Sequence, residues 1–195
     1  TSAPHGPLPE GHYPGTCRRL TAVERAEREA SGRPPALRVD AGSAVVAFVD
    51  RVHGAQEGVV DDFVVRRNDG AFAYNLAVVV DDGAQTIGEV VRGDDLLDST
   101  PRQLWLAARL KLPAFSFAHV PLVLGRDGAR LAKRHGAVTL ADRLEQGESA
   151  DDVRAQLAAS VGLAEPGERP SAAELVARFT PDRFTPPPSG PLSGL

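Results

Sequence analysis

The stretch on which the interpretation of this chain depends is Val120-Pro-Leu-Val-Leu-Gly-Arg-Asp-Gly-Ala-Arg-Leu-Ala-Lys-Arg-His-Gly-Ala-Val-Thr139. Its apolar beginning predicts a buried strand, Gly125 and Gly128 predict a turn, and a basic loop centred on Lys133 follows. Such a loop can bring a fixed ammonium group to a phosphate whose negative charge grows during a reaction. From the residues alone, an ordinary solvated basic loop is the more frequent interpretation.

Composition limits the classes of protein that need to be considered. The 195 residues suffice for one domain with a sizeable core or for two small domains. Hydrophobic residues at 42% and charged residues at 25% are typical of a soluble globular protein. The sequence shows neither an apolar run of bilayer length nor a signal-peptide pattern, so we expect no membrane partner. The single cysteine excludes an internal disulfide and fits the reducing cytoplasm, which is the expected location. The net charge of −4 argues against nucleic-acid binding through overall charge, though not against a local basic face.

Capping-box patterns predict where several helices begin. The helix that begins near residue 100 should have Thr100 as its cap and Pro101 as its first residue, and should end near Lys111-Leu-Pro113. In the two C-terminal helices we expect the apolar faces Val153/Leu157/Val161 and Leu175/Val176/Phe179. The capping-box patterns are Thr21-Ala-Val-Glu24 and Thr100-Pro-Arg-Gln103, and the two C-terminal helices should open at Ser149-Ala-Asp-Asp152 and Ser171-Ala-Ala-Glu174.

Strands are predicted between residues 37 and 80. Short β-branched runs fill Leu37 to Val60. Asn68-Asp-Gly70 is a hairpin-turn signal between predicted strands over 63–67 and 72–80. Leu76 to Val80 is apolar at every position, so we expect a strand that is buried on both faces.

Four motifs upstream of the basic loop, taken in order with that loop, resemble those of one known family. Arg130-Leu-Ala-Lys-Arg-His-Gly-Ala137 resembles the KMSKS loop of class I aminoacyl-tRNA synthetases, in the form used by the glutamyl branch. The resemblance covers roughly Thr1 to Asp142, and within the branch it is strongest to the glutamyl-Q tRNA(Asp) synthetases, short paralogues without an anticodon-binding domain. The upstream motifs are Asp61-Asp-Phe-Val-Val-Arg-Arg-Asn-Asp-Gly70, Ala73-Tyr-Asn-Leu-Ala-Val-Val-Val-Asp-Asp82, Val91-Arg-Gly-Asp-Asp-Leu-Leu97 and Thr100-Pro-Arg-Gln103.

This resemblance implies an α/β fold, namely the second half of a class I nucleotide-binding (Rossmann-type) fold with a small insertion region and a C-terminal helical region. The tail Pro186-Pro-Pro-Ser-Gly-Pro191 predicts disorder. The expected division is an insertion region with the remnant of a zinc motif at 1–60, the second half of the catalytic fold with the KMSKS-like loop at 61–137, a helical region contacting the tRNA stem at 138–184, and a disordered proline-rich tail at 185–195.

The resemblance also assigns roles in amino-acid activation. Lys133 occupies the second lysine position of KMSKS, so it is the expected catalytic residue that stabilises departing pyrophosphate. Arg130 stands at the first lysine position and Ala132 at the serine position, which removes one hydroxyl donor to phosphate. Together with Leu131 and Arg134, these residues form the expected binding loop for ATP, which would bind with Mg²⁺.

Tyr74 and Arg92 match the positions that hold glutamate in the family. A planar guanidinium suits bidentate carboxylate binding, and a tyrosine hydroxyl adds a directed hydrogen bond. The alternatives are a core tyrosine and an ordinary surface ion pair. Asp94 and Asp95 either orient Arg92, hydrogen-bond an adjacent helix or form a solvated loop, and His119 is interpreted as structural.

Tyr13-Pro-Gly-Thr-Cys17 resembles the second half of a zinc site, in which a Cys-x-Cys pair comes earlier in the chain. One phenol and one thiolate cannot hold Zn²⁺ alone, because zinc takes about four ligands. The earlier cysteines would precede Thr1. We therefore expect Zn²⁺ in the full-length protein, and a metal-free Cys17 in this chain.

The resemblance implies an enzyme that activates glutamate with ATP and transfers it to queuosine in tRNA(Asp), acting as a monomer. The HIGH signature of the family would precede Thr1, and the sequence contains no Met, so we expect a fragment that is inactive alone. Two alternatives stay open: a glutamyl-tRNA synthetase that charges tRNA(Glu), and a catalytically dead RNA- or protein-binding remnant.

Overall fold

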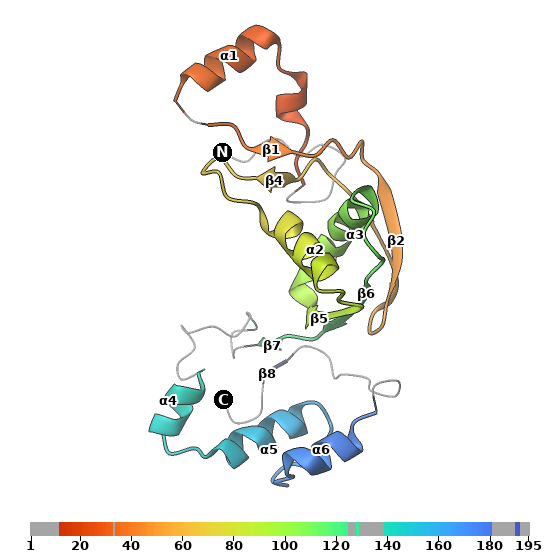
Figure 1. Ribbon diagram of the computed structural model, residues 1–195. Coiled ribbons are helices and arrows are strands. Elements are labelled where there is room, and N and C mark those ends of the chain that lie inside the picture. The colour runs from red at the N-terminus through yellow and green to blue at the C-terminus, as the bar shows by residue number, and fades with distance from the viewer. Residues whose placement is uncertain (1–11, 33, 125–127, 129–138, 181–189, 192–195) are drawn as a thin grey trace. The chain divides into compact units, whose positions relative to one another are not determined.

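The computed structural model describes residues 12–32, 34–124, 128, 139–180 and 190–191. The chain divides into two compact units, the first comprising residues 1–91 and 96–118 and the second comprising 92–95 and 119–195. Among the described residues, no helix is both long and apolar enough to cross a membrane. Along the chain (Figure 1) the elements are η1 (Thr16–Arg19), α1 (Ala22–Ala30), β1 (Leu37–Arg38), β2 (Val45–Asp50), β3 (Gly54–Val59), β4 (Val64–Arg66), α2 (Tyr74–Ala84), β5 (Glu89–Gly93), η2 (Asp94–Ser99), α3 (Thr100–Arg109), β6 (Ser116–Val120), β7 (Val123–Leu124), α4 (Leu140–Glu145), α5 (Ala150–Ser160), α6 (Ala172–Arg178) and β8 (Gly190–Pro191).

The main sheet is mixed, with strand order β3-β2-β6-β5. β2 and β3 form an antiparallel hairpin whose pairs run from Val45↔Val59 to Asp50↔Gly54. β2 and β6 are parallel and pair at Asp50↔Phe117. Helices alternate with these strands in the sequence, which is the pattern of an α/β fold and confirms the predicted fold class.

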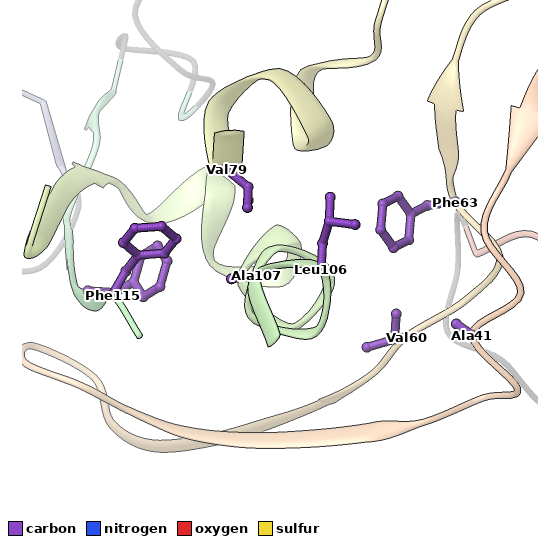
Figure 2. Packing of buried hydrophobic residues seen from close by; sticks show 8 residues of the cluster. Ala41, Val60, Phe63, Val79, Leu106, Ala107 and Phe115 are labelled. Atoms are coloured by element: carbon purple, nitrogen blue, oxygen red, sulfur yellow. The ribbon is translucent and has the colours of Figure 1, made fainter. Parts of the chain in front are cut away.

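The core of the first unit lies where α2 and α3 meet the strands. Phe63 and Trp105 pack edge to face, with ring centroids 6.2 Å apart and planes at 82°. Full burial of one aliphatic or phenylalanine side chain stabilises the folded state by about 1.5–3 kcal/mol, because its apolar surface is removed from water. Figure 2 shows Val79 of α2 and Leu106 and Ala107 of α3 in the same cluster as Phe63. The buried cluster comprises Ala41, Val60, Phe63, Val79, Leu106, Ala107, Phe115 and Phe117.

The prediction of a strand over residues 72–80, as the second strand of a hairpin, is wrong, because Tyr74–Ala84 forms helix α2. The Asn68-Asp-Gly70 turn is present, with Gly70 at a φ of 89°, but the strand pairing beyond it is limited to a single bridge between Arg66 and Phe72. When every residue of a run is apolar, the spacing of apolar residues cannot distinguish a buried strand from a helix. Within that run Val79 is buried while Val80 is 43% exposed, so the helix buries one side of it.

The predicted capping box at Thr21 is confirmed. The predicted helix starts at Ser149 and Ser171 are also confirmed, and each is a capping box in the structure. A fourth box, Thr139 with Asp142, opens α4 and was not predicted. The prediction for Thr100 is wrong, since the cap position is Ser99 and its side chain makes no capping bond. Thr100 is instead a fully buried helical residue, with Pro101 in the first turn.

The predicted apolar faces of the C-terminal helices are only partly buried. On α5, Leu157 is 49% exposed, and the fully buried residue is Ala158. On α6, Val176 is 77% exposed and Phe179 is 43% exposed. The predicted apolar side of α6 is therefore largely exposed, because helical spacing shows that side chains share a side without showing that anything covers it.

Close packing at Gly58 of β3 leads to a stability prediction. A Cβ built on Gly58 would lie 2.5 Å from Cγ of Pro101, and a proline ring cannot rotate away. Gly58→Ala is therefore expected to lower the free energy of unfolding by about 1–3 kcal/mol, the usual cost of overpacking. Urea unfolding monitored by circular dichroism measures this loss.

The matched control is Gly88→Ala. A Cβ at Gly88 meets nothing within 4 Å, and its φ lies outside the left-handed region. This substitution should leave stability nearly unchanged or raise it slightly. Equal unfolding free energies for the two variants would contradict the proposed contact with Pro101.

Candidate active site

The carboxylate-binding candidate Arg92 is held by a buried histidine. Arg92 lies near the end of β5 and is half-buried, and His119 lies on β6 and is fully buried. Nε of Arg92 donates a hydrogen bond to Nε2 of His119 over 2.9 Å. The interpretation of His119 as merely structural therefore overlooked its direct bond to a predicted site residue.

The backbone next to Arg92 is closely packed at Gly93. A Cβ at Gly93 would lie 2.6 Å from Oδ1 of Asp95 and 2.8 Å from Cδ2 of Leu122. Asp94 and Asp95 open the 3-10 helix η2, so the solvated-loop alternative for them is wrong. A larger residue at position 93 would therefore require the side-chain ends of Asp95 and Leu122 to shift, directly after the candidate arginine.

Tyr74 is the first residue of α2, and its side chain is 53% exposed. The core-tyrosine alternative is therefore wrong, and the ring is accessible to a ligand. The neighbouring Asn75 accepts a hydrogen bond through Oδ1 from Nε2 of buried Gln103 over 3.0 Å. This bond ties the first turn of α2, which carries Tyr74, to α3.

Tyr74 belongs to the first unit and Arg92 to the second, and each is described within its own unit. Their joint role in binding glutamate stays a prediction. The same holds for the expected division of the chain into functional regions.

A buried carboxylate links two of the sequence motifs. Asp61 is 4% exposed and its Oδ1 accepts from Nε of Arg102 over 2.7 Å. Its Oδ2 accepts from the backbone N–H of Tyr13 over 2.7 Å. Through Asp61, the motif at 61–70 therefore contacts both α3 and the segment that carries the predicted metal ligands Tyr13 and Cys17.

Tyr13 and Cys17, the two predicted metal ligands, are joined by a hydrogen bond. The backbone N–H of Cys17 donates to Oη of Tyr13 over 2.5 Å, and the Arg38 guanidinium lies 3.7 Å from the centre of the Tyr13 ring. Partial burial, followed by the side-chain hydrogen bond with Cys17, raises the pKa of the Tyr13 hydroxyl above its ordinary value, whereas the backbone N–H of Cys17 acts in the opposite direction. Cys17 is exposed and unpaired with another cysteine.

The described residues do not complete a zinc site. Within the described part of the chain, no three His, Cys, Asp or Glu residues are grouped closely enough to hold a metal ion. Tyr13 and Cys17 supply two donors at most, and structural zinc takes four. Zinc in a longer protein stays a prediction, and no step of the mechanism depends on it.

The predicted ATP-binding loop, Arg130, Leu131, Ala132, Lys133 and Arg134, lies outside the described residues. Before it, Val123–Leu124 forms strand β7, so a strand is present, but both residues are half-buried and the predicted burial is wrong. Gly128 has a φ of 74°, which favours glycine, while residues 125–127 of the predicted turn lie outside the described residues. β7 pairs in parallel with β8, Gly190–Pro191. The prediction of a disordered tail is therefore wrong for these two residues.

Comparison with known proteins assigns the family. The profile described as tRNA synthetases class I (E and Q), catalytic domain, matches residues 6–172. The chain belongs to this family. The resemblance that was deduced from the motifs is thereby confirmed, and it extends beyond the expected limit at Asp142.

Curated relatives within the family carry a more specific name. The chain is 58% identical over 183 residues to the glutamyl-Q tRNA(Asp) synthetase of Nocardia farcinica, covering 94% of this chain and 57% of that protein. It is 51% identical over 182 residues to the glutamyl-Q tRNA(Asp) synthetase of Symbiobacterium thermophilum, covering 91% of this chain and 56% of that protein. The chain thus spans little more than half the length of these relatives.

A solved structure supports the class I fold. The crystal structure of a glutamate tRNA ligase from Elizabethkingia meningosepticum, in complex with its amino acid, matches with a TM-score of 0.72 and 22% sequence identity. The match covers 93% of this chain and 42% of that one. At this level of identity it shows the fold, which confirms the α/β architecture of the family.

Proposed function

We propose that the protein containing this chain is a ligase that activates glutamate and transfers it to queuosine in tRNA(Asp). The similarity to two relatives of that name, at 58% and 51% identity, supports the acceptor. The observation that carries the amino-acid part is the guanidinium of Arg92, which is held through Nε by the buried ring of His119. A positioned guanidinium is well suited to bind a carboxylate.

In the proposed first step, an oxygen of the glutamate α-carboxylate attacks the α-phosphorus of ATP. Glutamyl-adenylate forms as the bond to pyrophosphate breaks. Arg92 holds a carboxylate of the amino acid, and the exposed Tyr74 hydroxyl adds a directed hydrogen bond. Lys133 and Arg130 supply positive charge as pyrophosphate leaves, and Mg²⁺ accompanies ATP when bound.

In the proposed second step, an oxygen of the acceptor base attacks the carbonyl carbon of the adenylate, and AMP leaves. Holding the adenylate and the acceptor in one site replaces a bimolecular encounter by a positioned reaction. This step requires the modified anticodon base to enter the site where the adenylate forms.

The acceptor is tested with the full-length product of the gene. Glutamate-dependent ATP–pyrophosphate exchange is expected without any tRNA, and labelled glutamate should pass to queuosine-containing tRNA(Asp). Queuosine-free tRNA(Asp) is the matched control and should stay unlabelled, as should tRNA(Glu). Labelling of tRNA(Glu) would identify an ordinary glutamyl-tRNA synthetase, and absence of exchange would favour a binding remnant without catalysis.

A further inference from the structure

We propose that His119 is the positioning residue for Arg92 and that this bond determines how tightly the protein binds the carboxylate of its amino acid. The proposal rests on the proposed function of Arg92. Sequence similarity assigns no role to His119, and the two residues are 27 positions apart in the chain.

The hydrogen bond determines which tautomer of the His119 imidazole is present. A guanidinium has donors and no acceptor, so the ring nitrogen that receives Nε–H must be the unprotonated one. Nε2 of His119 therefore carries the lone pair, and the ring proton of the neutral tautomer is on Nδ1. Full burial of His119 keeps bulk water from replacing the imidazole as the partner of Arg92.

The same bond specifies which part of Arg92 meets a ligand. The guanidinium is planar, and it presents Nε–H and the two terminal nitrogens in fixed directions. Because Nε–H points to His119, a carboxylate bound in a bidentate manner would meet the two terminal nitrogens. The bond also removes rotamers of a long side chain before the ligand arrives, which lowers the entropic cost of binding.

The backbone at the end of β5 supports this arrangement. A Cβ at Gly93 would displace the side-chain ends of Asp95 and Leu122, so the segment after Arg92 lies close to both side chains. A guanidinium on such a backbone, held by a buried ring, differs from an exposed arginine that must be ordered by its ligand.

The test compares two amides that differ by one methylene group in the full-length gene product. His119→Gln places a carbonyl oxygen near the position of Nε2 and should preserve the bond, whereas the shorter His119→Asn places its amide near the position of Nδ1 and should lose it. His119→Asn is expected to raise the glutamate KM on the order of tenfold, as loss of a hydrogen bond to a charged group does. His119→Gln should stay within about threefold of wild type, and the ATP KM should change little in both.

Double variants separate positioning from general damage. If His119 acts through Arg92, His119→Asn should cause no further rise of the glutamate KM when Arg92 is already alanine. Additive effects would overturn the proposal, as would an unchanged KM in His119→Asn or an equal rise in both amide variants. His53→Asn is the matched control, because His53 is exposed and lies in the β2–β3 turn, and it should change neither KM.

A measurement that is independent of activity distinguishes this inference from the proposed function. In NMR spectra the Arg92 Nε–H signal should be protected from solvent exchange in wild type and His119→Gln, and unprotected in His119→Asn. Equal protection in all three proteins would overturn the positioning role even if the enzyme is active. Wild-type protein that shows the protected signal without glutamate-dependent exchange would overturn the proposed function alone.

Discussion

Lys133→Ala is expected to lower the kcat of glutamate-dependent ATP–pyrophosphate exchange on the order of a hundredfold or more. The negative charge on the pyrophosphate oxygens increases as the bond to the α-phosphorus breaks, so a lysine that meets those oxygens stabilises the transition state more than bound ATP. The ATP KM should therefore change less than kcat. Steady-state exchange kinetics on the full-length gene product measure both.

Two variants serve as controls for this expectation. Lys133→Arg keeps the positive charge and should recover part of the lost rate. Lys111, the other lysine in the sequence, is exposed at the end of α3, and Lys111→Gln should leave kcat unchanged. A change in the ATP KM without a change in kcat would show that Lys133 binds ATP in the ground state and has no special role as pyrophosphate leaves.

Arg92→Ala is expected to raise the glutamate KM roughly ten- to a hundredfold. A charge-assisted hydrogen bond contributes about 1.5–3 kcal/mol, and each 1.4 kcal/mol corresponds to about tenfold in affinity. The truncation also leaves His119 Nε2 without the donor that it has in the native protein. Exchange kinetics at varied glutamate and saturating ATP measure the effect.

Arg92→Lys tests whether charge alone is sufficient. A lysine keeps the positive charge but loses both the planar fork and the Nε–H, so the KM should stay well above the wild-type value. Arg67→Ala is the matched control, since Arg67 is an exposed arginine whose 2.7 Å ion pair with Asp69 is of the kind that contributes little. An unchanged glutamate KM in Arg92→Ala would remove Arg92 from the binding site.

Local signals predicted where three helices begin, but they predicted the wrong secondary structure for the apolar run at residues 76–80. Thr21, Ser149 and Ser171 each bond to residues three positions ahead, so the sequence contains the whole interaction. Residues 76–80 contain no such signal. Whether they form a strand or a helix was decided by packing against α3 and the neighbouring strands, which bury Val79 and leave Val80 exposed.

The motif at residues 100–103 was recognised correctly in the sequence, but the structural role predicted for it was wrong. The sequence predicted a capping box, in which Thr100 and Gln103 would satisfy each other. In the structure Gln103 instead donates to Asn75, which lies 28 residues away, and Arg102 pairs with Asp61. The motif thus holds α3 against the first turn of α2 and the segment before β4.

By itself, the sequence determined the family and the beginnings of three helices, because these depend on residue identity and short spacing. It also supplied Tyr74, Arg92 and Lys133 as candidate site residues, whose roles stay predictions. The tertiary structure decided that residues 74–84 are a helix and that His119 is the partner of Arg92. Those outcomes depend on contacts between residues far apart in the chain, and the pairing of β5 and β6 within one sheet has no signal in residue spacing.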